Sequence, residues 1–159
     1  MTALVEPMPL RAFRIAYEVR GDIARLDIPA AQQPLRTDDL WRRTCFEVFV
    51  RSPHAAAYDE FNFSPSSEWA AWRFEHYRTG RVELELAAAP EVICTRDDRH
   101  LLLSVVVGRG DRSVDEVQIG LSAVLRDREG QLCYWALRHA PGKPDFHHDD
   151  AFAARLMLS

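Results

Sequence analysis

The sequence predicts an all-β protein: an antiparallel β-sandwich with little helix. Apolar and polar residues alternate with a period of two in several stretches, as they do on a half-buried strand. These stretches are short, rich in aromatic and β-branched residues, and separated at close intervals by Gly, Pro, Ser or Asp, a pattern typical of sandwiches and barrels. Since no long amphipathic helix is visible, we expect less than about a fifth of the chain to be helical, against an average of about a third.

The strands are expected in the following order. The alternating stretch 12–20 ends at a Gly-Asp pair and is predicted to form a hairpin with 23–28. Three strands follow in the aromatic-rich block 40–78. Later strand candidates lie at 82–86, 91–95, 100–107, 118–126 and 131–139. The last two are joined by Asp-Arg-Glu-Gly, a hairpin turn signal. A turn or two of helix is expected at 55–58 and at 150–158.

The block 40–78 holds three of the four tryptophans, and the rest of the fold is expected to form around it. Its strand candidates are 40–50, 58–65 and 69–78, each bounded by Pro, Ser or Gly. The first two are expected to be neighbours in the sheet, because consecutive strands usually pair.

Polar side chains interrupt one face of these two strands. Alternation places Glu47 opposite Phe46 and Val48, and places Glu60 and Asn62 opposite two phenylalanines. A buried unpaired carboxylate is costly, so a sheet built only for stability would seldom carry them there. The carboxylates could act as a general acid and base, bind sugar hydroxyls, or form a structural ion-pair network. The arginines that could complete such a network are Arg42, Arg73 and Arg78.

Length and composition predict one soluble domain that covers residues 1–159. The chain is 47% hydrophobic and 28% charged, which is ordinary for a globular protein of this length. The net charge of −4, with arginines scattered among acids, gives no basic face for nucleic acid or anionic membranes. The first residues lack a signal-peptide pattern, and no run approaches the roughly 18 apolar residues of a membrane span. The expected location is the cytoplasm.

Cysteine and histidine spacings predict no cofactor and no metal. The three cysteines are far apart and odd in number, which suits a reducing compartment and gives neither a disulfide framework nor a zinc pattern. The segment 139–150 contains three histidines and three aspartates, but their spacing fits no defined metal site. We expect 144–147 instead to pack on the sandwich, with Asp145 and His147 hydrogen-bonded to backbone or to the block 40–78.

The sequence also lacks the common catalytic motifs. It contains no glycine-rich phosphate loop, no Gly-x-Ser-x-Gly, no His-Glu-x-x-His and no Cys-x-x-Cys. We therefore expect a protein that is not an enzyme.

Several motifs carry a resemblance to a known family. They are Leu40-Trp41, Cys45-Phe46-Glu47-Val48-Phe49, Tyr58-x-Glu60-Phe61-Asn62-Phe63-Ser64-Pro65 with Trp69, Tyr134-Trp135-Ala136-Leu137-Arg138-His139 and Pro144-Asp145-Phe146-His147. Together they resemble the DOMON-like superfamily, and more narrowly its bacterial branch related to family 9 carbohydrate-binding modules. The resemblance spans nearly the whole chain.

The resemblance implies a β-sandwich of the jelly-roll type whose members bind sugars or haem. Sugar-binding members hold a saccharide end between two tryptophans and bind its hydroxyls with acidic, basic and amide groups. Trp41 and Glu47 match a clamp tryptophan and a hydroxyl acceptor. Trp135 matches the second tryptophan, and Arg73 or Arg78 the basic contact.

Haem-binding members use a methionine and a histidine as axial ligands. Met8 and Met157 lie near the termini and match no such position, which weighs against a haem site.

Taken together, the sequence predicts that the protein binds a small polar molecule, such as a saccharide, without transforming it. The candidate ligand-binding residues are Trp41, Glu47, Glu60, Asn62, Arg73, Arg78, Trp135 and His139. Three alternatives stay open: a haem-binding domain, a protein-interaction module with an exposed aromatic surface, and an enzyme that uses Glu47 or Glu60 with His139.

Overall fold

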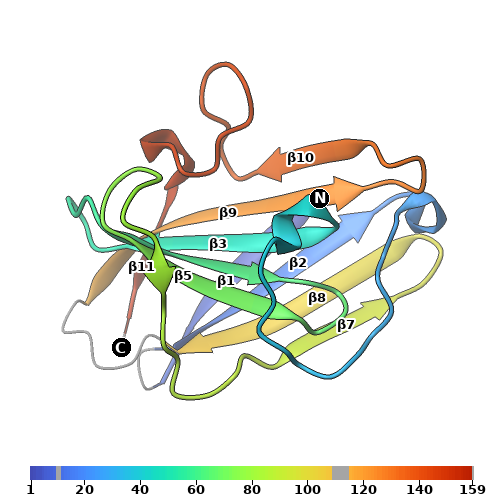
Figure 1. The fold of residues 1–159 in the computed structure, drawn as a ribbon, viewed down its shortest axis with the longest axis horizontal. Helices are drawn as coiled ribbons and strands as arrows, with labels where there is room; N and C mark the ends of the chain where they lie inside the picture. The colour runs from blue at the N-terminus through green and yellow to red at the C-terminus, as the bar shows by residue number, and fades with distance from the viewer. Residues whose placement is uncertain (10–11, 109–114, 159) are drawn as a thin grey trace.

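Two antiparallel β-sheets face each other in the computed structural model, which describes residues 1–9, 12–108 and 115–158 (Figure 1). Helical structure in these residues is limited to three short 3-10 helices, η1 (Ile23–Arg25), η2 (Leu40–Arg42) and η3 (Asp149–Ala151). The predicted all-β sandwich with little helix is therefore confirmed. None of the described helices has the length and apolar character needed to cross a membrane.

The smaller sheet has the strand order β1-β2-β8-β7. Its strands are β1 (Thr2–Met8), β2 (Ala12–Arg20), β7 (Val92–Arg96) and β8 (His100–Gly108). The larger sheet has the order β10-β9-β3-β4-β5-β6, and β11 pairs with the part of β9 that β10 leaves open. Its strands are β3 (Cys45–Arg51), β4 (Tyr58–Phe63), β5 (Trp69–Phe74), β6 (Val82–Glu83), β9 (Glu116–Arg126), β10 (Leu132–Ala136) and β11 (Ala154–Met157).

The main hydrophobic core lies between the two sheets. Alternation sends Phe46 and Val48 of β3, and Phe61 and Phe63 of β4, into this core, where all four side chains are buried. Residues 13, 15, 17 and 19 of β2 and residues 101, 103, 105 and 107 of β8 meet them from the smaller sheet. Burial of each such side chain contributes about 1.5–3 kcal/mol, so the core is the main source of stability.

The opposite face of the larger sheet is also partly covered. Antiparallel sheets commonly leave this second face in contact with solvent. Helix η2 and the segment 143–152, which follows β10 (Figure 1), lie over it. Between the sheet and this covering lies a second hydrophobic cluster, which consists of Phe49, Tyr58, Phe74, Val124, Phe146 and Phe152. The segment approaches β9 closely at Gly120, where a Cβ atom would lie 3.0 Å from the carbonyl oxygen of Ala151.

Hydrogen bonds hold the segment 144–147 on the block 40–78, as the sequence predicts. The carboxylate of Asp145 accepts from the Tyr77 hydroxyl and, at 2.8 Å, from the Arg78 guanidinium. The Tyr58 hydroxyl bonds Nδ1 of His147 at 2.7 Å. These contacts bring the end of the chain to the middle strands of the larger sheet.

Several predicted elements differ from the structure. The predicted strand 23–28 is wrong: it forms η1 and a loop, because β1 and β8 occupy both edges of β2. The missed strand β1 contains Pro7, which an edge strand tolerates. No helical turn forms at 55–58, and 150–158 contains β11 in addition to part of η3.

Candidate functional site

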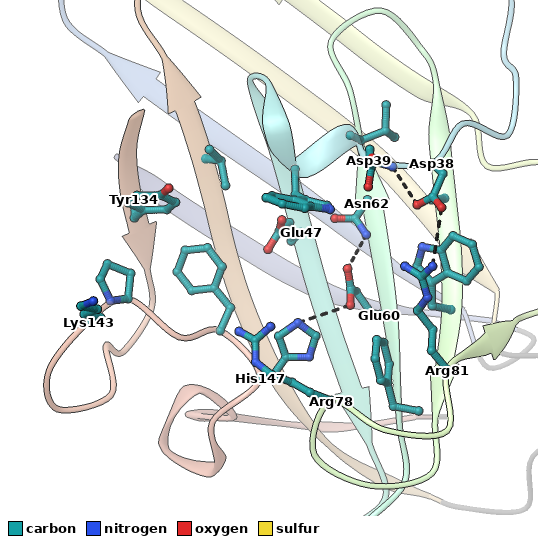
Figure 2. A pocket seen from close by; sticks show the side chains of 18 residues that line it. Asp38, Asp39, Glu47, Glu60, Asn62, Arg78, Arg81, Tyr134, Lys143 and His147 are labelled. Atoms are coloured by element: carbon teal, nitrogen blue, oxygen red, sulfur yellow. Dashed lines mark hydrogen bonds and ion pairs between the residues drawn. The ribbon is translucent and has the colours of Figure 1, made fainter. Parts of the chain in front are cut away.

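A cavity of about 660 Å³ opens on the outer face of the larger sheet, away from the smaller sheet (Figure 2). Its floor is formed by strand residues Glu47, Glu60, Asn62, Ala70, Trp72, Phe74, Val124 and Tyr134. Its walls are formed by loop and helix residues Asp38, Asp39, Leu40, Trp41, Arg78, Arg81, Lys143, Pro144, Phe146 and His147. A concave site of this volume with mixed aromatic and polar lining is typical of small-molecule binding.

Strand register explains the polar residues of the floor. Glu47 of β3 lies opposite Asn62 of β4 on one side and Ser122 of β9 on the other, so three polar side chains form a row across the sheet. Ser122 donates to Oε2 of Glu47 at 3.1 Å, and Asn62 donates to Oε1 of Glu60 at 2.6 Å. The Cys45 thiol donates to the Asn62 amide oxygen at 3.7 Å. The predicted placement of Glu47 and Asn62 on the face opposite the core is confirmed.

Glu47 and Glu60 form a buried pair of carboxyl groups. The exposed fractions are 4% for Glu47 and 7% for Glu60. Burial, followed by repulsion from Glu60, raises the pKa of Glu47 to about 8. Burial likewise raises the pKa of Glu60, whereas its hydrogen bond from Asn62 opposes this change. At neutral pH Glu47 is therefore protonated, and its carboxyl group can donate as well as accept a hydrogen bond.

His147 contacts Glu60 of this pair from the wall. The hydroxyl oxygen of Tyr58 accepts from the backbone N–H of Arg78 at 3.1 Å, and its O–H is free to donate to Nδ1 of His147. Nε2 of His147 lies 3.6 Å from Oε2 of Glu60 (Figure 2). Burial is the main cause that lowers the pKa of His147, to about 4. The ring is thus neutral at pH 7, and its contact with Glu60 is not an ion pair between full charges.

The arginines of the wall have carboxylates of their own. Arg78 is paired with Asp145 at 2.8 Å. Arg81 lies 3.6 Å from Asp38 and stacks over the Trp72 ring, with its central carbon 4.2 Å from the ring centroid. Among the described residues neither arginine forms an ion pair with a floor glutamate, although the charges of both act to lower the pKa of Glu60.

Trp41 stands at the mouth of the cavity. The residue before η2, Asp39, has a positive φ of 59°, a left-handed conformation that aspartate tolerates better than most residues. The short helix that follows presents Trp41, which keeps 45% of its surface exposed, and Arg42 lies 4.7 Å from its ring centroid. A partly exposed indole beside a polar floor is a suitable stacking surface.

The cavity brings together five of the eight candidate residues that the sequence predicts: Trp41, Glu47, Glu60, Asn62 and Arg78. The other three do not line it. Arg73 donates twice to Asp59, at 2.7 and 2.9 Å. Trp135 lies opposite Ala123 in the sheet and packs against the main core. His139 is exposed, with its ring 6.4 Å from that of Phe146.

Sequence reasoning missed Trp72 on the floor and most of the wall. Trp72 could have been found, because it alternates with Ala71 and Arg73 and so shares the face of Ala70. His147 was predicted only to anchor the tail, and Lys143, Asp38 and Arg81 carry no sequence signal that joins loops so far apart in the chain.

No cluster of three or more His, Cys, Asp or Glu side chains in the described part of the chain is arranged to hold a metal ion. The candidate site is therefore described by its aromatic surfaces, its buried carboxyl pair and the polar row.

No protein-family model and no curated protein sequence matches the chain. Two solved structures share its fold. One is a candidate carbohydrate-binding protein from Bacteroides uniformis, with a TM-score of 0.65 and 15% sequence identity, over 94% of this chain and 74% of that chain. The other is a family 9 carbohydrate-binding module from Caldicellulosiruptor kristjanssonii in complex with glucose, with a TM-score of 0.53 and 8% identity, over 93% and 71% of the two chains.

At these identities the likeness establishes a shared fold. The chain has a β-sandwich like that of a carbohydrate-binding module. The narrower resemblance to the DOMON-like superfamily stays a prediction.

Proposed function

We propose that the protein binds a small saccharide in the cavity on the outer face of the larger sheet and does not transform it. The observation that carries the proposal is the buried polar row of the floor beside the exposed indole of Trp41. The ring of a sugar presents C–H groups that pack on an aromatic face, while each hydroxyl both donates and accepts hydrogen bonds.

The protonation state of the floor suits this ligand class. Protonated Glu47 can donate a hydrogen bond, whereas Asn62 and Glu60 add further donor and acceptor groups. A polar ligand that carries both donors and acceptors can satisfy such a mixed set, and the glutamates have little contact with bulk water because they are buried. The shared fold with a glucose-bound module is consistent with the same ligand class.

The competing structural interpretation required a buried network of glutamate and arginine. Among the described residues, no arginine lies within ion-pair distance of Glu47 or Glu60. Two buried carboxyl groups without a cationic partner do not stabilise a fold, because burying incompletely hydrogen-bonded polar groups costs free energy. The arrangement is better explained by a ligand that uses them.

Trp41→Ala is expected to weaken saccharide binding about tenfold or more, because the loss of about 1.4 kcal/mol of stacking and burial corresponds to a factor of ten. Titration of the protein with glucose, cellobiose and other simple sugars, followed by intrinsic tryptophan fluorescence and by calorimetry, measures the affinity.

Trp135→Phe is the matched control, since Trp135 packs against the main core and does not line the cavity. Its sugar affinity should stay within twofold of that of the unmodified protein. Absence of any response to all sugars in the panel would contradict the proposed function. Equal affinities of the Trp41→Ala variant and the unmodified protein would place the sugar elsewhere.

A further inference from the structure

The floor of the cavity lacks a positive charge. The Glu47 carboxyl has one hydrogen bond among the described residues, from Ser122 to Oε2, and its Oε1 has no partner in that part of the chain. Glu47 has an exposed fraction of only 4%, and its side chain projects into the cavity in Figure 2. Glu60 accepts from Asn62, and its other close polar contact within the described residues is with the neutral imidazole of His147.

Two wall arginines act on this pair only through space, because the ion pairs that they form are with other carboxylates. Arg78 bonds Asp145, and Arg81 lies beside Asp38 while stacked on Trp72. Lys143 is exposed at the rim and has no ion pair with either glutamate. The arrangement therefore offers the ligand a buried carboxyl pair that becomes fully ionised only when the ligand brings a countercharge.

A metal ion is a poor countercharge here, because the described residues contain no group of three potential ligands. A protonated primary amine fits better. It has three N–H donors and no acceptor, and its hydrogen bonds to carboxylates are about twice as strong as neutral ones. The rings of Phe74 and Phe146, which also line the cavity, can attract a cation through their faces.

We propose that the cavity selects a saccharide bearing a protonated amine, such as glucosamine, over neutral sugars of the same size, with the amine held by Glu47 and Glu60. This inference rests on the proposed saccharide function and adds the chemical class of the ligand. Glu60 is the better-stabilised carboxylate of the pair, because Asn62 donates to it at 2.6 Å and the two wall arginines favour its charge.

The test compares glucosamine, glucose and N-acetylglucosamine by isothermal titration calorimetry on the intact protein, at a pH where the free amine is protonated. N-acetylglucosamine carries a substituent on the same nitrogen but no charge. We expect glucosamine to bind at least tenfold more tightly than either neutral sugar. Glu60→Gln and Glu47→Gln should each reduce this preference, and the double variant should bring it within about twofold.

Glu68→Gln is the matched control: Glu68 is an equally buried glutamate that accepts from Thr37 and Ser66 and does not line the cavity. It should leave the preference unchanged. If glucose binds as tightly as glucosamine, the inference is overturned while the saccharide function stands. If the preference survives in the double variant, the amine is held by other groups and the inference is also overturned. If no sugar binds, both proposals fail.

Discussion

Raising the pH from about 6.5 to about 8.5 should lower the free energy of unfolding by about 2 kcal/mol, and Glu47→Gln should remove most of this loss. Burial and repulsion from Glu60 raise the pKa of Glu47 from 4.5 to about 8 in the folded protein. In the unfolded chain Glu47 is ionised above pH 4.5, whereas in the folded chain it keeps its proton up to about pH 8. Stability is therefore greatest below the unfolded pKa and falls as the pH rises toward 8, by about 1.4 kcal/mol per pH unit.

His147 hides part of this effect at lower pH. Its folded pKa is lowered from 6.5 to about 4, so the stability it contributes is present above pH 6.5 and is lost as the pH falls through 4. Between pH 4.5 and 6.5 the slopes of Glu47 and His147 have opposite signs and nearly cancel. Above pH 6.5 the unfolded-state titration of His147 offsets only about 0.4 kcal/mol more and is complete by about pH 7.5, so the effect of Glu47 becomes visible.

Urea unfolding at pH 5.5, 6.5, 7.5 and 8.5 measures both slopes. Glutamine resembles the protonated glutamic acid in size and hydrogen bonding, so Glu47→Gln should change stability by less than about 1 kcal/mol at pH 6 and should flatten the curve above it. The Glu68→Gln control should keep the slope. An unchanged slope in Glu47→Gln would show that Glu47 is ionised in the folded protein. A loss of about 3–5 kcal/mol at pH 6 would indicate a buried ion pair instead.

The central strands could be predicted from the sequence because their alternation is strong. In β3 and β4, aromatic and β-branched residues define a core face so clearly that Glu47 and Asn62 can only point the other way. The prediction of two polar side chains on one outer face needed no knowledge of the partner strands. This is why the sequence predicts the three polar strand residues of the floor, Glu47, Glu60 and Asn62, and not its aromatic residues.

Other residues depend on contacts that alternation does not encode. The side of the sheet that Trp135 faces follows from the register that places it opposite Ala123, and a slip of one residue would reverse it. Arg73 shares its face with Asp59, which lies opposite it in β4, so the two side chains pair there. The walls come from loops around residues 38, 78 and 143, and only the folded chain brings these together.

Phe152→Ala is expected to lower the free energy of unfolding by about 3–5 kcal/mol and to weaken saccharide binding, although Phe152 does not line the cavity. Its buried ring makes edge contacts with Phe49 and Tyr58, at centroid distances of 6.3 and 5.8 Å, and Arg51 lies 4.1 Å from its centroid. Truncation removes these contacts and loosens the segment that carries His147 into the wall.

Chemical unfolding gives the stability, and calorimetry with the sugar panel gives the affinity of the protein that remains folded. Leu137→Ala is the control for truncating an apolar side chain in the region that follows β10. Because Leu137 is 44% exposed, this change should alter stability by no more than about 0.5 kcal/mol. Phe152→Leu keeps part of the buried volume and should give an intermediate loss of both stability and affinity. A Phe152→Ala protein that is destabilised yet binds sugar with unchanged affinity would show that the wall keeps its shape without this anchor, and the binding site would then depend on the sheet and η2 alone.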